Sequence, residues 1–285
     1  MLGIIGIAVV VMAVVGGYLL EGGSILVLMQ WVEFIIIGGA AGGALLISTP
    51  PKLLKKILTR VLMVFKKNEV AKETYLSLLK MMYELFVLSQ KDGLLALESH
   101  IEHPENSQIF SKYPEFAKQH HLLSFLTDTV RLILMGSVSP HEIEALMDTD
   151  LETQHQQGTR PGMILQKIGD SMPGLGIVAA VLGIVITMQA IGGPAEEVGK
   201  KVAAALVGTF LGVLLSYGFI QPLSTNLDLQ HEEEARVLEV IKAGLVAFAK
   251  GFNPMVAMEF SRRSIFDDSR PTFQEMEEAL RGSKK

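Results

Sequence analysis

The chain has 285 residues, of which 49% are hydrophobic, and it carries a formal net charge of −5 at pH 7. This composition is too apolar for an ordinary soluble domain, and the chain is long enough for several membrane spans and a separate soluble part. It contains no cysteine, which excludes disulfides, thiolate metal sites and thiol nucleophiles. We expect no nucleic-acid partner.

Four apolar segments are each long enough to cross a membrane. Residues 2–20, 172–192 and 202–222 are uncharged, and residues 25–48 contain one charged residue, Glu33. A helix needs roughly 20 residues to cross about 30 Å of hydrocarbon. The sequence therefore predicts four transmembrane helices.

The positive charges indicate the orientation of these helices. No lysine or arginine occurs in residues 1–51, and a basic run follows the second span directly: Lys52, Lys55, Lys56, Arg60, Lys66 and Lys67. Positive charge concentrates on the cytoplasmic side of membranes, so we expect both termini and both long soluble segments in the cytoplasm. The basic run could alternatively contact acidic lipid.

The soluble segments show the spacing of amphipathic helices, with apolar residues three and four apart. The expected helices are residues 73–90, 121–136, 139–157 and 270–281, and the second should end at Gly136 as its C-cap. Ser139 with Glu142, and Thr272 with Glu275, form capping-box sequences at the starts of the last two. Beyond Pro222 an apolar stripe continues to Phe248, which predicts that the fourth span extends as a long stalk.

The expected fold is thus an all-α integral membrane protein with four transmembrane helices and a helical cytoplasmic domain. Residues 1–48 hold the first two spans, and residues 49–170 form the cytoplasmic domain. Residues 171–222 hold the other two spans, and residues 223–285 form the stalk and tail.

We find no constellation typical of an enzyme. The seven histidines show no His-Glu-x-x-His spacing, and no glycine-rich phosphate loop precedes a lysine. We expect no catalytic residue, no cofactor site and no metal site.

Small residues crowd three of the spans. They are Gly38, Gly39, Gly42 and Gly43 with the alanines between them, then Gly174, Gly176, Ala179, Ala180 and Gly183, and finally Ala203, Ala204, Ala205, Gly208 and Gly212. Small residues let membrane helices approach closely. Packing within one chain is one interpretation, and contact with further subunits or another protein's helix is the other.

Ionisable residues are missing where an ion pathway would need them. The third and fourth spans offer only hydroxyls, mainly Thr187, Thr209 and Ser216. Glu33 lies near the outer end of its span beside Trp31, and we interpret it as an interface anchor. If this protein conducts ions, a partner must supply the carboxylate.

Two prolines fall at the same membrane boundary. With the third span running outward and the fourth running back, Pro173 and Pro222 reach equal depth. Each removes a backbone donor from its helix. They either mark helix ends or form a joint that passes motion from the membrane to the cytoplasmic domain.

Several separated motifs resemble the MotA family of flagellar motor stator subunits. The matching stretches are "SLLKMMYELFVLSQKDGLLALESHIE", "DSMPGLGIVAAVLGIV", "VGTFLGVLLSYGFIQPL" and "RPTFQEMEEAL". The resemblance implies a bacterial inner-membrane protein that assembles as five copies around a MotB dimer. MotB would supply the ion-carrying aspartate, and ion flow would turn the rotor through contact with FliG.

The resemblance also implies roles for particular residues. Pro173 and Pro222 match prolines that couple ion passage to conformational change, and Ala180 and Thr209 would line the channel. Glu98 stands at the glutamate position of the rotor contact. Gln90 aligns with the basic position and Lys91 is the nearest cation. Lys91 and Glu98 would share a face if their helix were continuous across Gly93.

Sodium-type relatives have a threonine where this chain has Ala180. Losing that hydroxyl weakens coordination of a desolvated sodium ion, so the expected ion is a proton, with sodium as the alternative. Two other functions stay open: an energy-transducing subunit like TolQ or ExbB, and a self-contained ion channel. The former relatives typically have three spans, whereas four are expected here.

Overall fold

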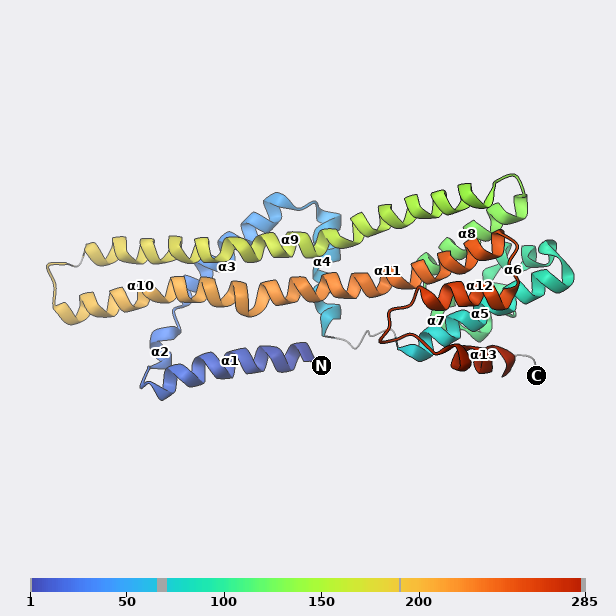
Figure 1. The fold of residues 1–285 in the computed structure, drawn as a ribbon. Helices are drawn as coiled ribbons and strands as arrows, with labels where there is room; N and C mark the ends of the chain where they lie inside the picture. The colour runs from blue at the N-terminus through green and yellow to red at the C-terminus, as the bar shows by residue number, and fades with distance from the viewer. Residues whose placement is uncertain (1, 66–70, 190, 283–285) are drawn as a thin grey trace. The chain divides into compact units, whose positions relative to one another are not determined.

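A computed structural model describes residues 2–65, 71–189 and 191–282 of the chain, which fold as helices and their connections (Figure 1). The chain forms two compact units. The span unit comprises residues 1–68 and 158–230, and the loop unit comprises residues 69–157 and 231–285. The predicted all-α class is confirmed. Lys66 and Lys67 of the basic run lie outside the described residues.

Four helical segments are long and apolar enough to cross a membrane, as predicted. The first is α1 (Leu2–Leu20). The second is broken into α2 (Ile25–Leu28) and α3 (Trp31–Ser48), whereas one continuous helix was expected. The break comes from Gln30, whose carbonyl accepts the N–H groups of Glu33 and Phe34 and so starts a new helix.

The third span belongs to one helix, α9 (Pro140–Met188), of 49 residues. Two separate elements, 139–157 and 172–192, were expected. Proline in a helix interior ordinarily breaks or kinks the helix, and this segment contains Pro161 and Pro173. Both prolines instead lie inside α9. The helix begins at the predicted capping box, in which the Ser139 N–H donates to Glu142 Oε2 at 2.9 Å and the Glu142 N–H donates to Ser139 Oγ at 3.3 Å.

The fourth span continues beyond Pro222, as predicted. Helix α10 (Ala195–Leu215) starts earlier than the expected residue 202. It passes into a π-helical turn, η4 (Ser216–Ile220), and then into α11 (Gln221–Ala249). Within the span unit, α10 packs against α2 and α3, and buried Ile37, Ala179, Val207 and Leu211 form the core there.

Helix α4 (Pro51–Val64) packs Val64 against Leu165 of α9 and Leu227 of α11. Lys52 and Lys55 of this helix are exposed, and Lys56 is half-buried.

The loop unit is built on α5 (Lys72–Asp92), which buries one side from Tyr75 to Ser89. The ring of Phe86 stacks on Phe248 of α11 with 4.3 Å between centroids. Helix α8 (His120–Met135) ends at Gly136 in the left-handed conformation, the predicted C-cap. Short turns lie between α5 and α8: η1 (Leu94–Leu97), α6 (Glu98–Glu102), η2 (Pro104–Asn106), η3 (Phe110–Lys112) and α7 (Pro114–Ala117).

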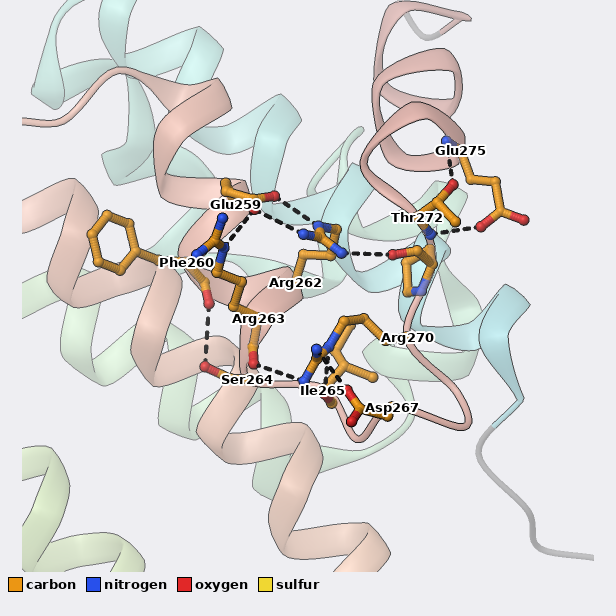
Figure 2. Close-up of polar contacts among 11 residues, drawn as sticks. Glu259, Phe260, Arg262, Arg263, Ser264, Ile265, Asp267, Arg270, Thr272 and Glu275 are labelled. Atoms are coloured by element: carbon orange, nitrogen blue, oxygen red, sulfur yellow. Dashed lines mark hydrogen bonds and ion pairs between the residues drawn. The ribbon is translucent and has the colours of Figure 1, made fainter.

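The chain's last two helices, α12 (Pro254–Arg263) and α13 (Phe273–Arg281), are joined by a polar cluster (Figure 2). Glu259 accepts hydrogen bonds from Arg262 at 2.7 Å and from Arg263 at 2.7 Å. Arg262 also donates to the carbonyl of Pro271 at 3.0 Å. The Arg262 guanidinium thus contacts both Glu259 and the carbonyl of Pro271. Glu259 thereby orients the arginine that holds the connection leading into α13.

The start of α13 shows the second predicted capping box. The Thr272 N–H donates to Glu275 Oε2 at 2.6 Å, and the Glu275 N–H donates to Thr272 Oγ1 at 3.2 Å. Lys72 of α5 donates to Glu275 Oε1 at 3.0 Å. This carboxylate therefore joins the two ends of the loop unit.

Replacing Glu259 with glutamine should loosen α13. The hydrogen bond from Arg262 lowers the pKa of Glu259 below its ordinary value near 4.5. The variant removes a charge-assisted contact worth about 1–2 kcal/mol, and amide hydrogen exchange across 273–281 should accelerate at neutral pH.

The effect should depend on pH with a definite sign. A carboxyl whose pKa is lowered by folding stabilises the fold above its unfolded value, and that stability disappears as pH falls through the folded value. Glu259→Gln and the parent chain should therefore converge in exchange rate only once the pH has fallen below the lowered pKa of Glu259. Asp267→Asn, which alters a pair whose carboxylate is 89% exposed, is the matched control and should change exchange little. Equal acceleration in both variants would contradict the prediction.

Candidate functional site

The third and fourth spans approach each other through glycines (Figure 1). A Cβ atom on Gly176 would lie 2.7 Å from the carbonyl oxygen of Gly208. One on Gly212 would lie 2.6 Å from the carbonyl oxygen of Met172, and one on Gly183 would lie 2.7 Å from Ala205 Cβ. Any larger residue at these positions would push the helices apart. Packing within the chain thus accounts for these small residues.

The glycines of the second span behave differently. Within 4 Å of a Cβ built on Gly38, Gly39, Gly42 or Gly43, the described part of the chain places no atom. This face of α3 is therefore open, and packing within one chain does not account for it.

Pro173 leaves a carbonyl without its helical donor, and Ser216 supplies a replacement. In an α-helix the N–H of residue 173 would donate to the carbonyl of Gly169, but proline has no N–H. Ser216 Oγ donates to the Gly169 carbonyl at 2.7 Å. Gly169 is buried, and Ser216 is fully buried. This hydroxyl explains why α9 continues through Pro173.

A small polar network surrounds that bond. The Gln221 side chain donates to Ser216 Oγ at 3.2 Å and to Asp170 Oδ1 at 2.9 Å. Gln166 also donates to Asp170 Oδ1, at 3.0 Å. The network connects α9 with both ends of the π-helical turn. We call these residues, with Gly169 and the two prolines, the junction.

The π-helical turn lies directly before Pro222. Its backbone bond runs from the Gln221 N–H to the Ser216 carbonyl, five residues back. Single π turns inside α-helices recur at functional sites. Pro222 is exposed and Pro173 is half-buried, and both adjoin the junction along the chain. Their role as a coupling joint stays a prediction. Sequence reasoning named Ser216 only as a hydroxyl; the signal for its role was a proline four residues after Gly169.

Of the two residues expected to line a channel, Ala180 lies in the contact between the two spans. Ala180 and Thr209 are both half-buried. The Ala180 nitrogen would lie 3.1 Å from a Cβ on Gly208. Thr187 donates to the carbonyl of Gly183 at 2.8 Å, its own helix backbone. Channel lining by Ala180 and Thr209 stays a prediction.

Glu33 does not lie where the sequence suggested. Its exposed fraction is 6%, against 68% for Trp31. A Cβ on Gly208 would lie 2.7 Å from Glu33 Oε2, so the carboxyl fills the space that this glycine leaves. The interpretation of Glu33 as an interface anchor is wrong. The break at Gln30 restarts the helix and sets Glu33 in its first turn.

The residues expected at the rotor contact lie on the loop unit. Gln90 and Lys91 are exposed near the end of α5, and Glu98 is exposed at the start of α6. Gly93 has a φ of +85° and ends α5, so no continuous helix places Lys91 and Glu98 on one face. Among the residues that the structure describes, none of these three side chains has a hydrogen bond or an ion pair.

The residues around Glu98 include an exposed leucine and a carboxylate that is already hydrogen-bonded. Leu95, between the two charged positions, is 76% exposed. Glu102, one turn after Glu98, accepts a hydrogen bond from Arg131 at 2.8 Å, which lowers the pKa of Glu102. Arg131 also donates to Asp128. Glu102 is thus engaged within the unit, whereas Glu98 is available to a partner.

Comparison with known proteins gives consistent matches along the chain. The model of the family described as "Motility protein A N-terminal" matches residues 4–93, and that of the "MotA/TolQ/ExbB proton channel family" matches residues 117–240. The chain is 39% identical to motility protein A of Escherichia coli (strain K12) over 284 residues, covering 100% of this chain and 96% of that protein. It is also 39% identical to motility protein A of Salmonella typhimurium over 281 residues, covering 99% and 95%.

Two solved structures share the fold. The structure of the flagellar MotAB stator complex from Bacillus subtilis matches with a TM-score of 0.72 at 26% identity, covering 90% of this chain and 92% of that chain. The structure of C. jejuni MotAB matches with a TM-score of 0.76 at 23% identity, covering 95% and 98%. The second shows the likeness of fold alone.

The proline and the serine at the junction should be energetically coupled. Ser216→Ala leaves the buried Gly169 carbonyl without a donor, which costs about 1–3 kcal/mol. In a Pro173→Ala background the new backbone N–H can donate to that carbonyl, so Ser216→Ala should there cost little. Thermal unfolding of the purified full chain in detergent, over the complete double-mutant cycle, measures the coupling.

Ser224→Ala is the matched control. Ser224 Oγ donates to the carbonyl of Gly162 at 2.8 Å, but residue 166 is not a proline and keeps its backbone N–H. Its loss should be smaller and independent of position 173. An equal cost of Ser216→Ala in both backgrounds would refute the compensation.

Proposed function

The chain belongs to the motility protein A family of MotA/TolQ/ExbB proton channel proteins, and on this premise we propose how it works as a flagellar motor stator subunit. It is a channel subunit and not an enzyme. The observation that carries this conclusion is 39% identity along the whole length of motility protein A. The same full-length match favours a stator over a TolQ- or ExbB-like subunit.

The partner is a MotB-type subunit that supplies the ion-carrying carboxylate. Residues 171–188 of α9 and 202–215 of α10 contain no charged side chain. Ion passage through a bilayer usually needs an ionisable group, and the carboxyl that these two spans enclose, Glu33, comes from α3 and is buried. We therefore assign the ion-carrying carboxylate to the helix of a partner. The similar solved structure from Bacillus subtilis is of a MotAB stator complex, which supports the same assignment.

Several copies of the chain surround that partner, and we propose five around a MotB dimer. The support is that two helix faces of a single copy have no neighbouring helix within the described chain. Helix α1 has no buried residue, and the glycine face of α3 has no neighbour among the described residues. Both faces can pack against lipid or a neighbouring copy in the bacterial inner membrane. The basic residues after the second span favour cytoplasmic termini.

Protons are the proposed ion. A desolvated sodium ion needs several oxygen ligands, and Ala180 brings none where sodium-type relatives have a threonine. Thr209 remains as a single hydroxyl. The junction at Pro173 and Pro222 would then transmit the effect of ion passage to the loop unit, since α9 and α11 both run from one unit into the other.

The loop unit turns the rotor by contact with FliG. Glu98, Lys91 and Leu95 are all exposed, and neither charge is engaged within the described chain. An exposed leucine between two unpaired charges is the usual composition of an interface anchor with a polar rim. Gln90 lies beside Lys91 and contributes no charge.

Motility should require both this chain and its partner. In a bacterium lacking its own stator genes, the chain with a MotB-type partner should restore swimming, and the chain alone should not. Swimming should persist when sodium is replaced by potassium. Restored swimming without the partner would contradict the shared-channel proposal, and loss of swimming on sodium withdrawal would contradict the choice of proton.

Reversing the charge of Glu98 should weaken rotor engagement without disturbing the fold. Glu98→Lys alters an exposed carboxylate that has no partner among the described residues, so stator abundance and assembly should be unchanged while swimming speed and stall torque fall. Glu115→Lys makes the same change at another exposed position of the loop unit and should leave speed near normal. If the two variants swim alike, Glu98 is ordinary surface charge.

A further inference from the structure

Glu33 lies inside the span unit and not at its surface. It occupies the first turn of α3, three residues after the break at Gln30. Its exposed fraction is 6%. It is the only charged residue of the second span. The first span and residues 171–188 and 202–215 contain none, so this carboxyl is isolated among apolar segments.

No residue that the structure describes forms a hydrogen bond or an ion pair with the buried carboxyl. Oε2 is inaccessible to solvent and accepts no hydrogen bond from any described residue. The carboxyl of Glu33 occupies space that two glycines of the third and fourth spans leave open. We call this space the notch. A Cβ on Gly208 would lie 2.7 Å from Oε2, and one on Gly183 would lie 3.8 Å from Oε1. The two spans that lack charge of their own thus enclose the carboxyl of a third.

No counter-charge stands close by on the packed elements. Helix α2, residues Ile25–Leu28, is entirely apolar. The nearest cation along α10 is Lys201, seven residues before Gly208, which places its backbone about 10 Å away along the helix axis. Lys200 pairs with Glu196 at 2.7 Å. Along α9 the nearest charged residue is Asp170, and it lies at the opposite end of the span from Gly183.

A carboxylate in this position is costly. An ionised group taken from water into an apolar surrounding loses several kcal/mol unless a partner compensates, and such groups persist in membrane helices chiefly where they serve a function. The carboxyl therefore exists as the neutral acid when it is buried. Any ionised state needs water to reach it or the two spans to move.

We propose that Glu33 is a proton-binding site of this chain, which takes up and releases a proton as the third and fourth spans move during ion transport. The step is R–COO⁻ + H⁺ → R–COOH and its reverse, with no electron transfer. A proton needs only this one carboxyl, whereas a metal cation would need several oxygen ligands around the notch, and the Thr187 hydroxyl beside Gly183 is already engaged with the Gly183 carbonyl at 2.8 Å. This inference rests on the proposed channel function and adds a second proton site to the carboxyl supplied by the partner.

The test compares the complete stator complex with and without this carboxyl. Glu33→Gln matches the shape of the neutral acid, so folding and assembly should be preserved, which co-purification of the partner verifies. Proton flux into vesicles should fall by at least about tenfold, and the upper bound is the roughly 10²–10⁴-fold that a positioned proton-transfer group contributes to catalysis. Glu33→Asp keeps a titratable group and should restore part of the flux.

Infrared absorption gives a readout that a purely structural role would not change. The unmodified complex at neutral pH should show a protonated-carboxyl carbonyl band that is missing from the Glu33→Gln complex. Glu21→Gln is the matched control, since Glu21 is exposed just after α1, and it should alter neither flux nor band.

The outcomes separate this proposal from the wider function. If the unmodified complex conducts no protons, the proposed channel function fails. If it conducts and Glu33→Gln conducts equally well, or the protonated band is unchanged in that variant, Glu33 is not a proton site and the inference falls.

Discussion

The close contact between the third and fourth spans is the constraint on which the rest of the span unit depends. Three glycines, Gly176, Gly208 and Gly212, interlock so closely that a methyl group on any of them would strike a neighbouring main-chain atom or, at Gly208, the carboxyl of Glu33 as well. In a bilayer no hydrophobic force drives helices together, so such contact has to come from shape and dispersion. Glycine supplies the shape. It also determines where polar groups can be accommodated, because a helix pair at this separation leaves notches without side chains.

The junction follows from the same closeness. A proline in a buried helix leaves one carbonyl without a donor, and in hydrocarbon that carbonyl cannot turn to water. Only a neighbour as near as α10 and its π-helical turn can reach it with a side chain as short as serine. The compensation is also specific to one arrangement of the helices, because a hydroxyl at 2.7 Å loses its bond after a small displacement. Pro173 thereby ties the continuity of α9 to the position of the fourth span, which is the kind of contact that a two-state joint requires.

Sequence patterns predicted the features that depend on local chemistry. Four spans, the capping boxes at Ser139 and Thr272 and the glycine stop at Gly136 are all found, since each is decided by residues within a few positions of one another. The continuity of α9 could not be predicted, because the group that replaces the Pro173 donor lies 47 residues away from Gly169. Burial of Glu33 was missed for a related reason. An apolar span has no polar face to set its rotation, so the sequence could not show that this side chain turns toward Gly208.

The placement of charge across the chain is consistent with a division of tasks. In the loop unit several carboxylates are engaged in internal ion pairs: Glu102 with Arg131, Glu84 with Lys112 and Glu275 with Lys72. Glu98 stands apart from these internal pairs. In the span unit, the buried Oε2 of Glu33 also accepts no hydrogen bond from the residues that the structure describes. Internal ion pairs rigidify a unit, whereas an unpaired polar group remains available to a partner from outside the unit. For Glu98 the proposed partner is another protein, and for Glu33 it is a proton. In the proposed mechanism the two residues would mark the two ends of the conversion, ion uptake in the membrane and force at the protein surface. The helices α9 and α11 each run from one unit into the other.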